Sequence, residues 1–405
     1  MVTWKSERFR NILFIPLFLF GMTGCANSGK KSLTAAAFAE WFIAPSASFP
    51  ADTRIPDYKT VESLVRTIRQ TARPETTSLI LSDTAGNPFT VGIETPKTFR
   101  NDTLYPCVIY LHGGIGTDRN DKGAEAYRML SMLNDSMSVF IASPSANRTT
   151  PWWSPAGLSR ILQTLRYMSI HYPVNPDKIF VAGVSDGATG CWAVANCISG
   201  PFAGFFPVSG FGGMLSRFGI QLYPQNLMQR PIYTIHAGRD RLYPAEFVNR
   251  FLDQLEAAGV GVVRKMYPEE EHGFDYRLKE CATLCSLITV WEHPSVKGFV
   301  WDCDKRLPIC IDRFFNIRWS GESGQSAQLR CYQKNDTLYI ATQGISTCGM
   351  YFENMNNGPT SIAVSVNNNE QRMRTSVLSG ERLLQFIKYR CCPLCTECTH
   401  LELSL

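Results

Sequence analysis

The stretch from Lys178 to Ala188 limits what this chain can fold into more than any other. An apolar run with β propensity reaches the pattern Gly-x-Ser-x-Gly, and a segment of small residues with helical spacing follows. A serine on a sharp turn between a strand and a helix needs neighbours without a Cβ atom, and Gly183 and Gly187 supply them. The pattern predicts a strand, a tight turn that exposes the Ser185 hydroxyl, and a helix. A flexible loop rich in glycine and serine would match the same pattern by chance.

A second predicted strand, Tyr105 to Leu111, runs through a histidine into the glycine pair Gly113 and Gly114. Backbone N–H groups of such a loop can meet the N–H that follows a nucleophilic serine, here that of Asp186, and form an oxyanion hole. The Asp186 N–H also lies at the start of a predicted helix, where the helix dipole favours negative charge. We therefore predict an oxyanion hole made by Gly113, Gly114 and Asp186.

An acid and a base follow two later strands of the chain. Asp240 lies on the loop after a predicted strand at 231–236, and His272 lies on the loop after another at 262–267. Side chains at the carboxyl ends of parallel strands converge on one edge of the sheet. Ser185, Asp240 and His272, in this order along the chain, are therefore the predicted catalytic residues.

Other residues could take some of these roles. Glu246 and Asp275 are alternative acids, and Asp240 is preferred over both. His236 lies at a strand end where no base is needed, so we expect it to shape the Asp240 loop.

Taken together, these motifs resemble those of the α/β-hydrolase superfamily, most closely its dienelactone-hydrolase-like, polyester-depolymerase-like and prolyl-oligopeptidase-like branches. The motifs are His-Gly-Gly at 112–114, Gly-x-Ser-x-Gly at 183–187, His-x-Gly-x-Asp at 236–240 and His-Gly at 272–273, within about Thr77 to Glu292. The resemblance implies a mostly parallel sheet with helices on both faces, and a serine hydrolase that needs no cofactor or metal. Two positions depart from the pattern: Ala188 replaces a common glycine, and Asp186 replaces a larger apolar residue. Position 186 is expected to act through its backbone.

Alternating strands and helices from about 104 to 292 predict a parallel sheet covered on both faces, preceded by an antiparallel hairpin at the sheet edge. From residue 314 onward, short segments separated by Gly, Asn and Asp turns predict a small antiparallel β domain. The predicted division of the chain is 1–24 lipoprotein signal peptide, 25–72 tether and N-terminal helix, 73–292 α/β-hydrolase catalytic domain, 293–313 linker, 314–390 small β accessory domain and 391–405 cysteine-rich tail.

The N-terminus has the pattern of a targeting segment. A basic head leads into an apolar run at 12–20, which is too short to span a bilayer, and then into Met22-Thr23-Gly24-Cys25. This pattern resembles a bacterial lipoprotein cleavage box, which implies lipidation of Cys25 and a membrane anchor on the exported protein. Ala26 lacks the aspartate that signals inner-membrane retention in some bacteria, which favours the outer membrane. An ordinary secretory peptide is the alternative.

Charge and cysteine content limit the possible partners. The formal net charge is +5, of which +2 lies in the first 24 residues, and no basic stripe indicates a nucleic-acid partner. Thirteen cysteines follow Cys25 in a compartment that permits disulfides. Cys303 and Cys310 are a plausible disulfide, and small buried roles are expected for the cysteines at 191, 197, 281 and 285. The tail from Cys391 to Cys398 could hold a metal, but its spacing lacks the two separated knuckles of structural zinc, so no metal is predicted.

Three residues on the loop after the second parallel strand are candidate substrate contacts. Trp152 and Trp153 could stack on sugar or aryl groups, although packing under the loop is the simpler interpretation. The Arg148 guanidinium could bind a substrate carboxylate, or it could be solvated.

Three classes of function agree with the sequence. The favoured one is an exported serine hydrolase that cleaves carboxylic esters in small molecules or on polysaccharides. A serine peptidase of the prolyl-oligopeptidase kind is the second, although only about 80 residues separate Cys25 from the His-Gly-Gly strand, too few for a gating propeller. A non-catalytic, glycan-binding lipoprotein is the third.

Overall fold

The computed structural model describes residues 31–44, 49–71, 75–293, 298–304, 317–320, 326–334, 337–345, 347–353, 361–374, 376–377, 380–394 and 398–404. Three predicted features lie outside these residues: the signal peptide at 1–24, the lipidation site Cys25, and Cys310, the predicted disulfide partner of Cys303. No helix within the described ranges combines the length and the apolar character needed to cross a membrane.

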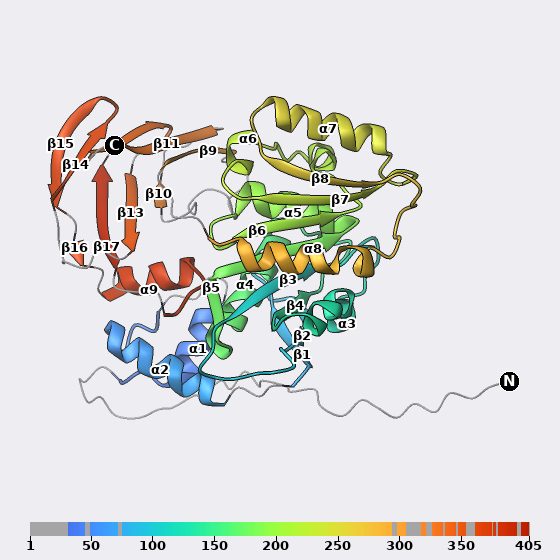
Figure 1. The fold of residues 1–405 in the computed structure, drawn as a ribbon. Coiled ribbons are helices and arrows are strands. Elements are labelled where there is room, and N and C mark those ends of the chain that lie inside the picture. Colours follow the sequence, from blue (N-terminus) through green and yellow to red (C-terminus); the bar gives the residue numbers. More distant parts are fainter. Residues whose placement is uncertain are drawn as a thin grey trace.

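An eight-stranded sheet forms the centre of the molecule, in the order β1-β2-β4-β3-β5-β6-β7-β8 (Figure 1). β1 and β2 pair antiparallel at one edge, β2 pairs antiparallel with β4, and every other pair is parallel. This is the predicted α/β-hydrolase fold, with the predicted hairpin at the sheet edge. The strands are β1 (Thr77–Ser82), β2 (Pro88–Glu94), β3 (Tyr105–Leu111), β4 (Phe140–Pro144), β5 (Val174–Val184), β6 (Gly204–Val208), β7 (Ile232–Ala237) and β8 (Val262–Tyr267).

Helices cover both faces of this sheet, because its central strands are apolar on both sides. In β3, Ile109 and Leu111 pack into one hydrophobic cluster with α4, α5 and α7, while Val108 and Tyr110 pack into a second cluster with η1 and α8. The period of two along a strand sends neighbouring side chains to opposite faces. The helices are α3 (Gly123–Ala126), the 3₁₀ helix η1 (Tyr127–Asp135), α4 (Pro155–His171), α5 (Asp186–Cys197), the 3₁₀ helix η2 (Gly212–Phe218), α6 (Pro224–Leu227), α7 (Ala245–Ala257) and α8 (Arg277–Val290).

The segment predicted as a tether is packed. α1 (Ala35–Ile43) and α2 (Tyr58–Gln70) share a buried hydrophobic cluster with α9 (Gly380–Tyr389), which comes from the far end of the chain. Phe38 and Phe42 of α1 are fully buried, and Lys388 of α9 lies over the Trp41 ring. The prediction of a tether over this part of 25–72 is wrong, because its aromatic residues are buried against a helix that is distant in the sequence.

The last part of the chain forms two further sheets, in the orders β15-β14-β12-β11-β9 and β10-β13-β17-β16. Their pairing is mostly antiparallel, with β12 and β14 parallel. The strands are β9 (Gly298–Asp304), β10 (Ile317–Ser320), β11 (Ser326–Lys334), β12 (Thr337–Gln343), β13 (Thr347–Glu353), β14 (Ser361–Val366), β15 (Asn369–Arg374), β16 (Ser376–Val377) and β17 (Cys398–Ser404).

Two predicted boundaries of this part are wrong. The predicted linker at 293–313 contains β9, whose Trp301 is fully buried, and the Asp302 backbone exchanges two hydrogen bonds with the Asn226 amide. The predicted cysteine-rich tail contains β17. Both strands depend on long-range pairing that a local pattern does not reveal.

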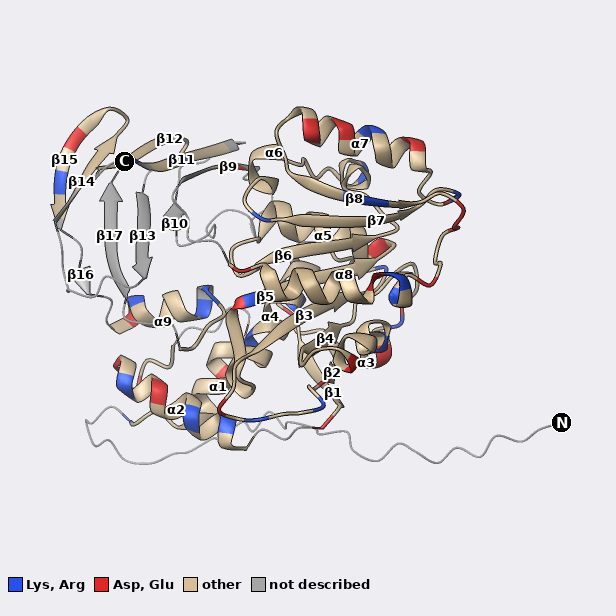
Figure 2. Ribbon diagram, in the orientation of Figure 1, with Lys and Arg blue, Asp and Glu red and all other residues tan. Residues whose placement is uncertain are grey.

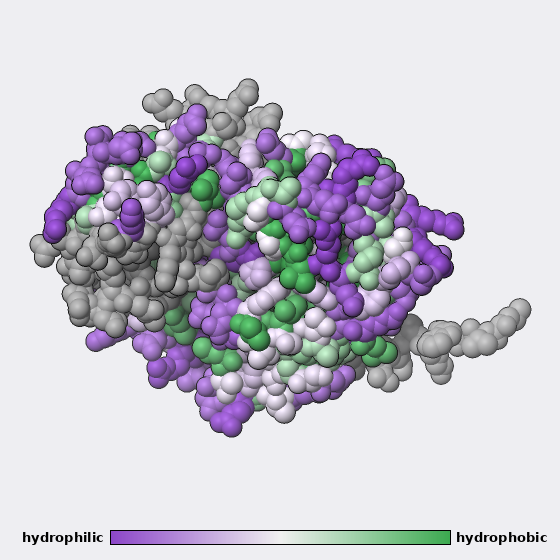
Figure 3. All heavy atoms as spheres, turned by 45° about the horizontal axis from the view of Figure 1, so that its top comes forward, coloured by the Kyte–Doolittle hydropathy of each residue, from purple (hydrophilic) through white to green (hydrophobic). Residues whose placement is uncertain are grey.

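Residues of both charge signs lie along helices such as α2 and α7 (Figure 2), where Glu62 pairs with Arg66 and Glu246 pairs with Arg250. Hydrophobic residues on the face shown in Figure 3 gather in small groups between hydrophilic ones. Scattered exposure of this kind is ordinary for a globular protein.

The cysteines predicted to be buried follow that prediction in part. Cys191 and Cys197 are buried on α5, whereas Cys281 and Cys285 on α8 are only partly buried. None of these four forms a disulfide.

Candidate active site

The serine turn joins β5 to α5 with very little space around it. A Cβ atom on Gly183 would lie 2.3 Å from the Gly187 carbonyl oxygen, and one on Gly187 would lie 1.9 Å from the Leu111 carbonyl oxygen. Only glycine fits at these two positions. Ser185 itself has φ 57° and ψ −118°, a conformation that costs energy for a residue with a side chain and occurs at functional turns.

The serine, histidine and aspartate predicted from the sequence meet at the carboxyl ends of the strands. His272 Nε2 lies 3.1 Å from Ser185 Oγ, and His272 Nδ1 lies 2.7 Å from Asp240 Oδ2. The Asp240 side chain has no exposed surface, whereas His272 is 21% exposed. The arrangement gives the imidazole one neighbour that can donate a proton and one buried acceptor.

The loop after β7 holds Asp240 in place through its second carboxylate oxygen. The backbone N–H groups of Leu242 and Tyr243 donate to Asp240 Oδ1 over 2.9 and 2.8 Å. His236 Nε2 hydrogen-bonds the Tyr243 carbonyl oxygen over 2.8 Å, and burial lowers the pKa of His236. His236 therefore shapes the Asp240 loop, as the sequence indicated.

The two alternative acids make other contacts. Glu246 pairs with Arg250 on the exposed side of α7, and Asp275 pairs with Arg277. Of the three candidate acids, Asp240 is the one bonded to His272.

The glycine loop after β3 lies directly against the serine. A Cβ atom on Gly113 would be 3.0 Å from both Ser185 Cβ and the Val184 carbonyl oxygen, and Gly114 has φ +64°. The Asp186 N–H belongs to the first turn of α5, where backbone N–H groups have no acceptor within the helix. The structure thus places Gly113 directly against Ser185, and Asp186 at the start of the helix that follows the serine.

His112 fixes this loop through both of its ring nitrogens. Nε2 accepts a hydrogen bond from the Ala146 N–H over 3.1 Å, so the Nδ1 proton is donated to the Gly113 carbonyl oxygen over 2.9 Å. Burial lowers the pKa of His112 to about 4, which keeps the ring neutral near pH 7. Its tautomer is set by these two partners.

The side chain of Asp186 has a role that sequence reasoning missed. Its Oδ2 accepts a hydrogen bond from the Ile115 N–H over 3.0 Å, and its Oδ1 accepts one from the Tyr243 hydroxyl over 3.4 Å. The only sequence signal was the unusual acid at this position, and Tyr243 had no signal at all.

The candidate substrate contacts have different outcomes. Trp152 has no exposed surface, and its indole N–H donates to the His112 carbonyl oxygen over 2.9 Å. The prediction that Trp152 contacts substrate is wrong, because the ring packs under the loop. Trp153 is 8% exposed and packs against Phe218 at a ring distance of 4.5 Å. Arg148 is exposed and pairs with Asp118, and its contact with substrate stays a prediction.

Residues 146–293 match the dienelactone hydrolase family. This part of the chain is similar to dienelactone hydrolase family domains. The match includes the serine turn, the Asp240 loop and the His272 loop. The matched family is a hydrolase family, in agreement with the α/β-hydrolase fold described above.

Three similar solved structures are a thermostable esterase, the acylaminoacyl peptidase of Pyrococcus horikoshii and an esterase of Thermogutta terrifontis. Their sequence identities to this chain are 19%, 14% and 12%, with TM-scores of 0.44, 0.45 and 0.43. The alignments cover 56%, 58% and 55% of this chain, and 64%, 44% and 96% of the other chains. The chain thus spans less than two thirds of the first two proteins. A search among curated proteins finds no match.

Proposed function

We propose that this protein is a serine hydrolase that cleaves carboxylic esters by two-step acyl transfer. The observation that carries the proposal is the hydrogen-bonded series from Ser185 through His272 to Asp240. The family match supports a hydrolase, and the word dienelactone in the family description denotes a cyclic ester.

In the first step, Ser185 Oγ attacks the ester carbonyl carbon while His272 Nε2 takes the hydroxyl proton. Asp240 holds the Nδ1–H tautomer and stabilises the imidazolium that forms. The N–H groups of Asp186 and of the Gly113–Gly114 loop stabilise the tetrahedral oxyanion. When the carbonyl re-forms, the carbon–oxygen bond to the alcohol breaks, and the alcohol leaves with the proton from His272.

In the second step, water attacks the acyl-enzyme. His272 accepts a proton from the water and then returns it to Ser185 Oγ as the acid is released. Both steps need the same oxyanion hole, since each passes through a tetrahedral intermediate.

The protein is also proposed to be exported and lipid-anchored through Cys25, with the outer membrane as the favoured location. The basis is the sequence at 5–25 alone. Incorporation of an alkyne-labelled fatty acid into the full chain, lost in Cys25→Ser, tests the anchor. An unlabelled protein that is still exported would point to the ordinary secretory peptide instead.

The central experiment combines a covalent probe with two substrate classes. A fluorophosphonate should label the native protein and leave Ser185→Ala unlabelled. p-Nitrophenyl acetate or butyrate should be turned over far faster than aminoacyl-nitroanilides. Faster cleavage of the anilides would favour the peptidase alternative. Equal labelling of native protein and Ser185→Ala would remove Ser185 from the mechanism. A native protein that is not labelled and turns over neither substrate class would favour the non-catalytic binding protein.

A further inference from the structure

The peptide groups on both sides of Gly114 are held by side chains. The Gly113 carbonyl oxygen accepts a hydrogen bond from His112 Nδ1 over 2.9 Å. The Ile115 N–H donates to Asp186 Oδ2 over 3.0 Å, and the Gly114 carbonyl accepts a hydrogen bond from the exposed Lys122. Every contact fixes one end of a planar peptide group.

These contacts decide where the Gly114 N–H points. In a trans peptide the C=O and N–H point in opposite directions, so holding the Gly113 oxygen on one side directs the Gly114 N–H to the other. Glycine has the widest choice of backbone conformations, and Gly114 has φ +64°. The Asp186 contact to the Ile115 N–H therefore acts together with the His112 and Lys122 contacts to keep Gly114 in this conformation.

The second oxygen of Asp186 reaches the opposite wall of the site. The Tyr243 hydroxyl donates to Asp186 Oδ1 over 3.4 Å, and the Tyr243 ring lies 5.6 Å from the His272 ring between centroids. The backbone N–H of Tyr243 holds Asp240. A single carboxylate, on the residue that follows the serine, therefore connects the glycine loop with the loop that carries the acid.

We propose that the Asp186 side chain is a positioning residue for the oxyanion hole, acting through Ile115 on the glycine loop and Tyr243 on the acid loop. The inference rests on the proposed function. It adds a side-chain role to a residue whose backbone N–H is the expected oxyanion donor, and it explains why an acid occupies a position where an apolar residue is common.

The test compares Asp186→Leu with Asp186→Asn in the full chain. Leucine has the branched shape of aspartate, with larger methyl groups in place of the two oxygens, and it accepts no hydrogen bond. Since loss of one oxyanion donor costs roughly 10²- to 10³-fold in turnover, a misdirected donor should lower kcat for p-nitrophenyl butyrate by about 10- to 100-fold, with KM changed by less than about threefold. Asparagine can still accept from Ile115 and can donate to the Tyr243 oxygen, so kcat should stay within about threefold of the native value.

A second measurement separates positioning from a general loss of structure. A trifluoromethyl ketone adds to Ser185 and places a negative oxygen in the oxyanion hole, so its affinity for Asp186→Leu should fall by the same factor as kcat/KM. Asp186→Ala removes the same oxygens without added bulk. It replaces Asp186→Leu in both measurements if the leucine variant does not fold. The control is Asp253→Leu, which removes an exposed carboxylate that pairs with Arg264 on the surface, and it should keep native activity.

Two results would overturn the inference: native kcat in both Asp186→Leu and Asp186→Ala, or a loss in Asp186→Asn as large as in Asp186→Leu. A drop in kcat without a matching drop in ketone affinity would also overturn it. A native protein that neither hydrolyses esters nor reacts with the fluorophosphonate would instead refute the proposed function itself, so the two failures are distinct.

Discussion

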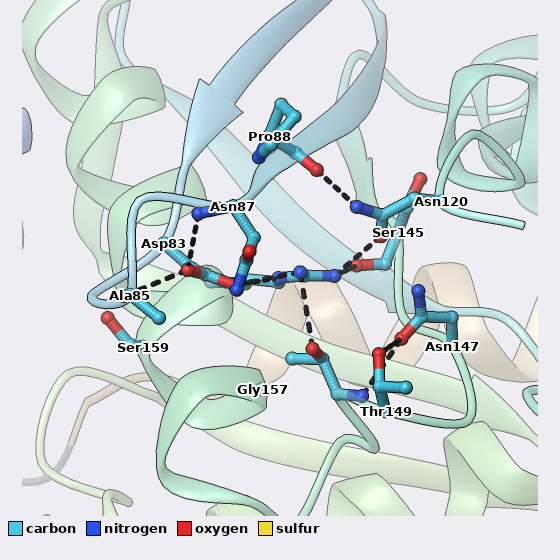
Figure 4. Close-up of polar contacts among 12 residues, drawn as sticks. Asp83, Ala85, Asn87, Pro88, Asn120, Ser145, Asn147, Thr149, Gly157 and Ser159 are labelled. Carbon is cyan, nitrogen blue, oxygen red and sulfur yellow. Dashed lines mark hydrogen bonds and ion pairs between the residues drawn. The ribbon is translucent and has the colours of Figure 1, made fainter. Parts of the chain in front are cut away.

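A buried ion pair behind the active site allows a quantitative prediction. Arg160 of α4 and Asp83 of the β1–β2 turn are both nearly without exposed surface, and Arg160 Nη2 lies 2.8 Å from Asp83 Oδ2. The guanidinium also donates to Asn120 Oδ1 and to the Ser145 carbonyl oxygen (Figure 4), and to Thr150 Oγ1. A second hydrogen bond to Asp83 comes from Arg160 Nε. The five N–H donors of the guanidinium thus make five hydrogen bonds.

The perturbation is Arg160→Met, which keeps an apolar chain of similar length. It leaves Asp83 with only the backbone N–H groups of Ala85 and Asn87 on Oδ1, and it removes the Arg160 donor from three further oxygens. Breaking a buried pair from one side costs about 3–5 kcal/mol, and that range is the expected loss in free energy of unfolding. Burial raises the pKa of Asp83, but Arg160 and the two N–H groups lower it by more, so the native pair is ionised at pH 7.

The assay is equilibrium urea unfolding at pH 7, followed by tryptophan fluorescence. Asp83→Asn combined with Arg160→Met removes the uncompensated charge and should recover at least about 1 kcal/mol relative to Arg160→Met alone. The control is Arg250→Met, whose partner Glu246 is exposed, and its cost should stay below about 1 kcal/mol. A loss below about 1 kcal/mol for Arg160→Met, or no recovery in the double variant, would refute the reasoning.

Three further predictions concern the site. Burial holds the pKa of His112 near 4, below its ordinary 6.5. The contribution of His112 to stability is therefore complete above about pH 6.5 and is lost toward pH 4 at about 1.4 kcal/mol per pH unit. His112→Asn should flatten the pH dependence of urea unfolding by about one proton, and an unchanged slope would contradict this. Because Ser185 has φ 57°, Ser185→Gly should be more stable than Ser185→Ala by about 1 kcal/mol, and equal melting temperatures would argue against strain at the turn. Asp240→Asn should lower kcat about 10⁴-fold through the wrong histidine tautomer, whereas less than a tenfold loss in a folded variant would assign the acid role elsewhere.

Local pattern predicted the hydrolase sheet well. β3 and β8 have the expected bounds, because apolar runs between turn residues are properties of contiguous sequence. The α/β-hydrolase motifs also placed the serine, the acid and the base on three loops. The burial of α1 and the strands β9 and β17 were missed, since each depends on partners that lie elsewhere along the chain.

The sequence by itself determined the order of strands and helices and the positions of Ser185, Asp240 and His272 on loops after strands. Only the tertiary structure decided which acid meets His272, that Trp152 faces inward, and that the Asp186 carboxylate bonds to a backbone N–H 71 positions away. The physical reason is the range of the interactions. Periodicity and turn chemistry act between neighbours in the chain. These hydrogen bonds depend instead on the order of the strands in the sheet, where β3 lies next to β5 and β7 follows after β6.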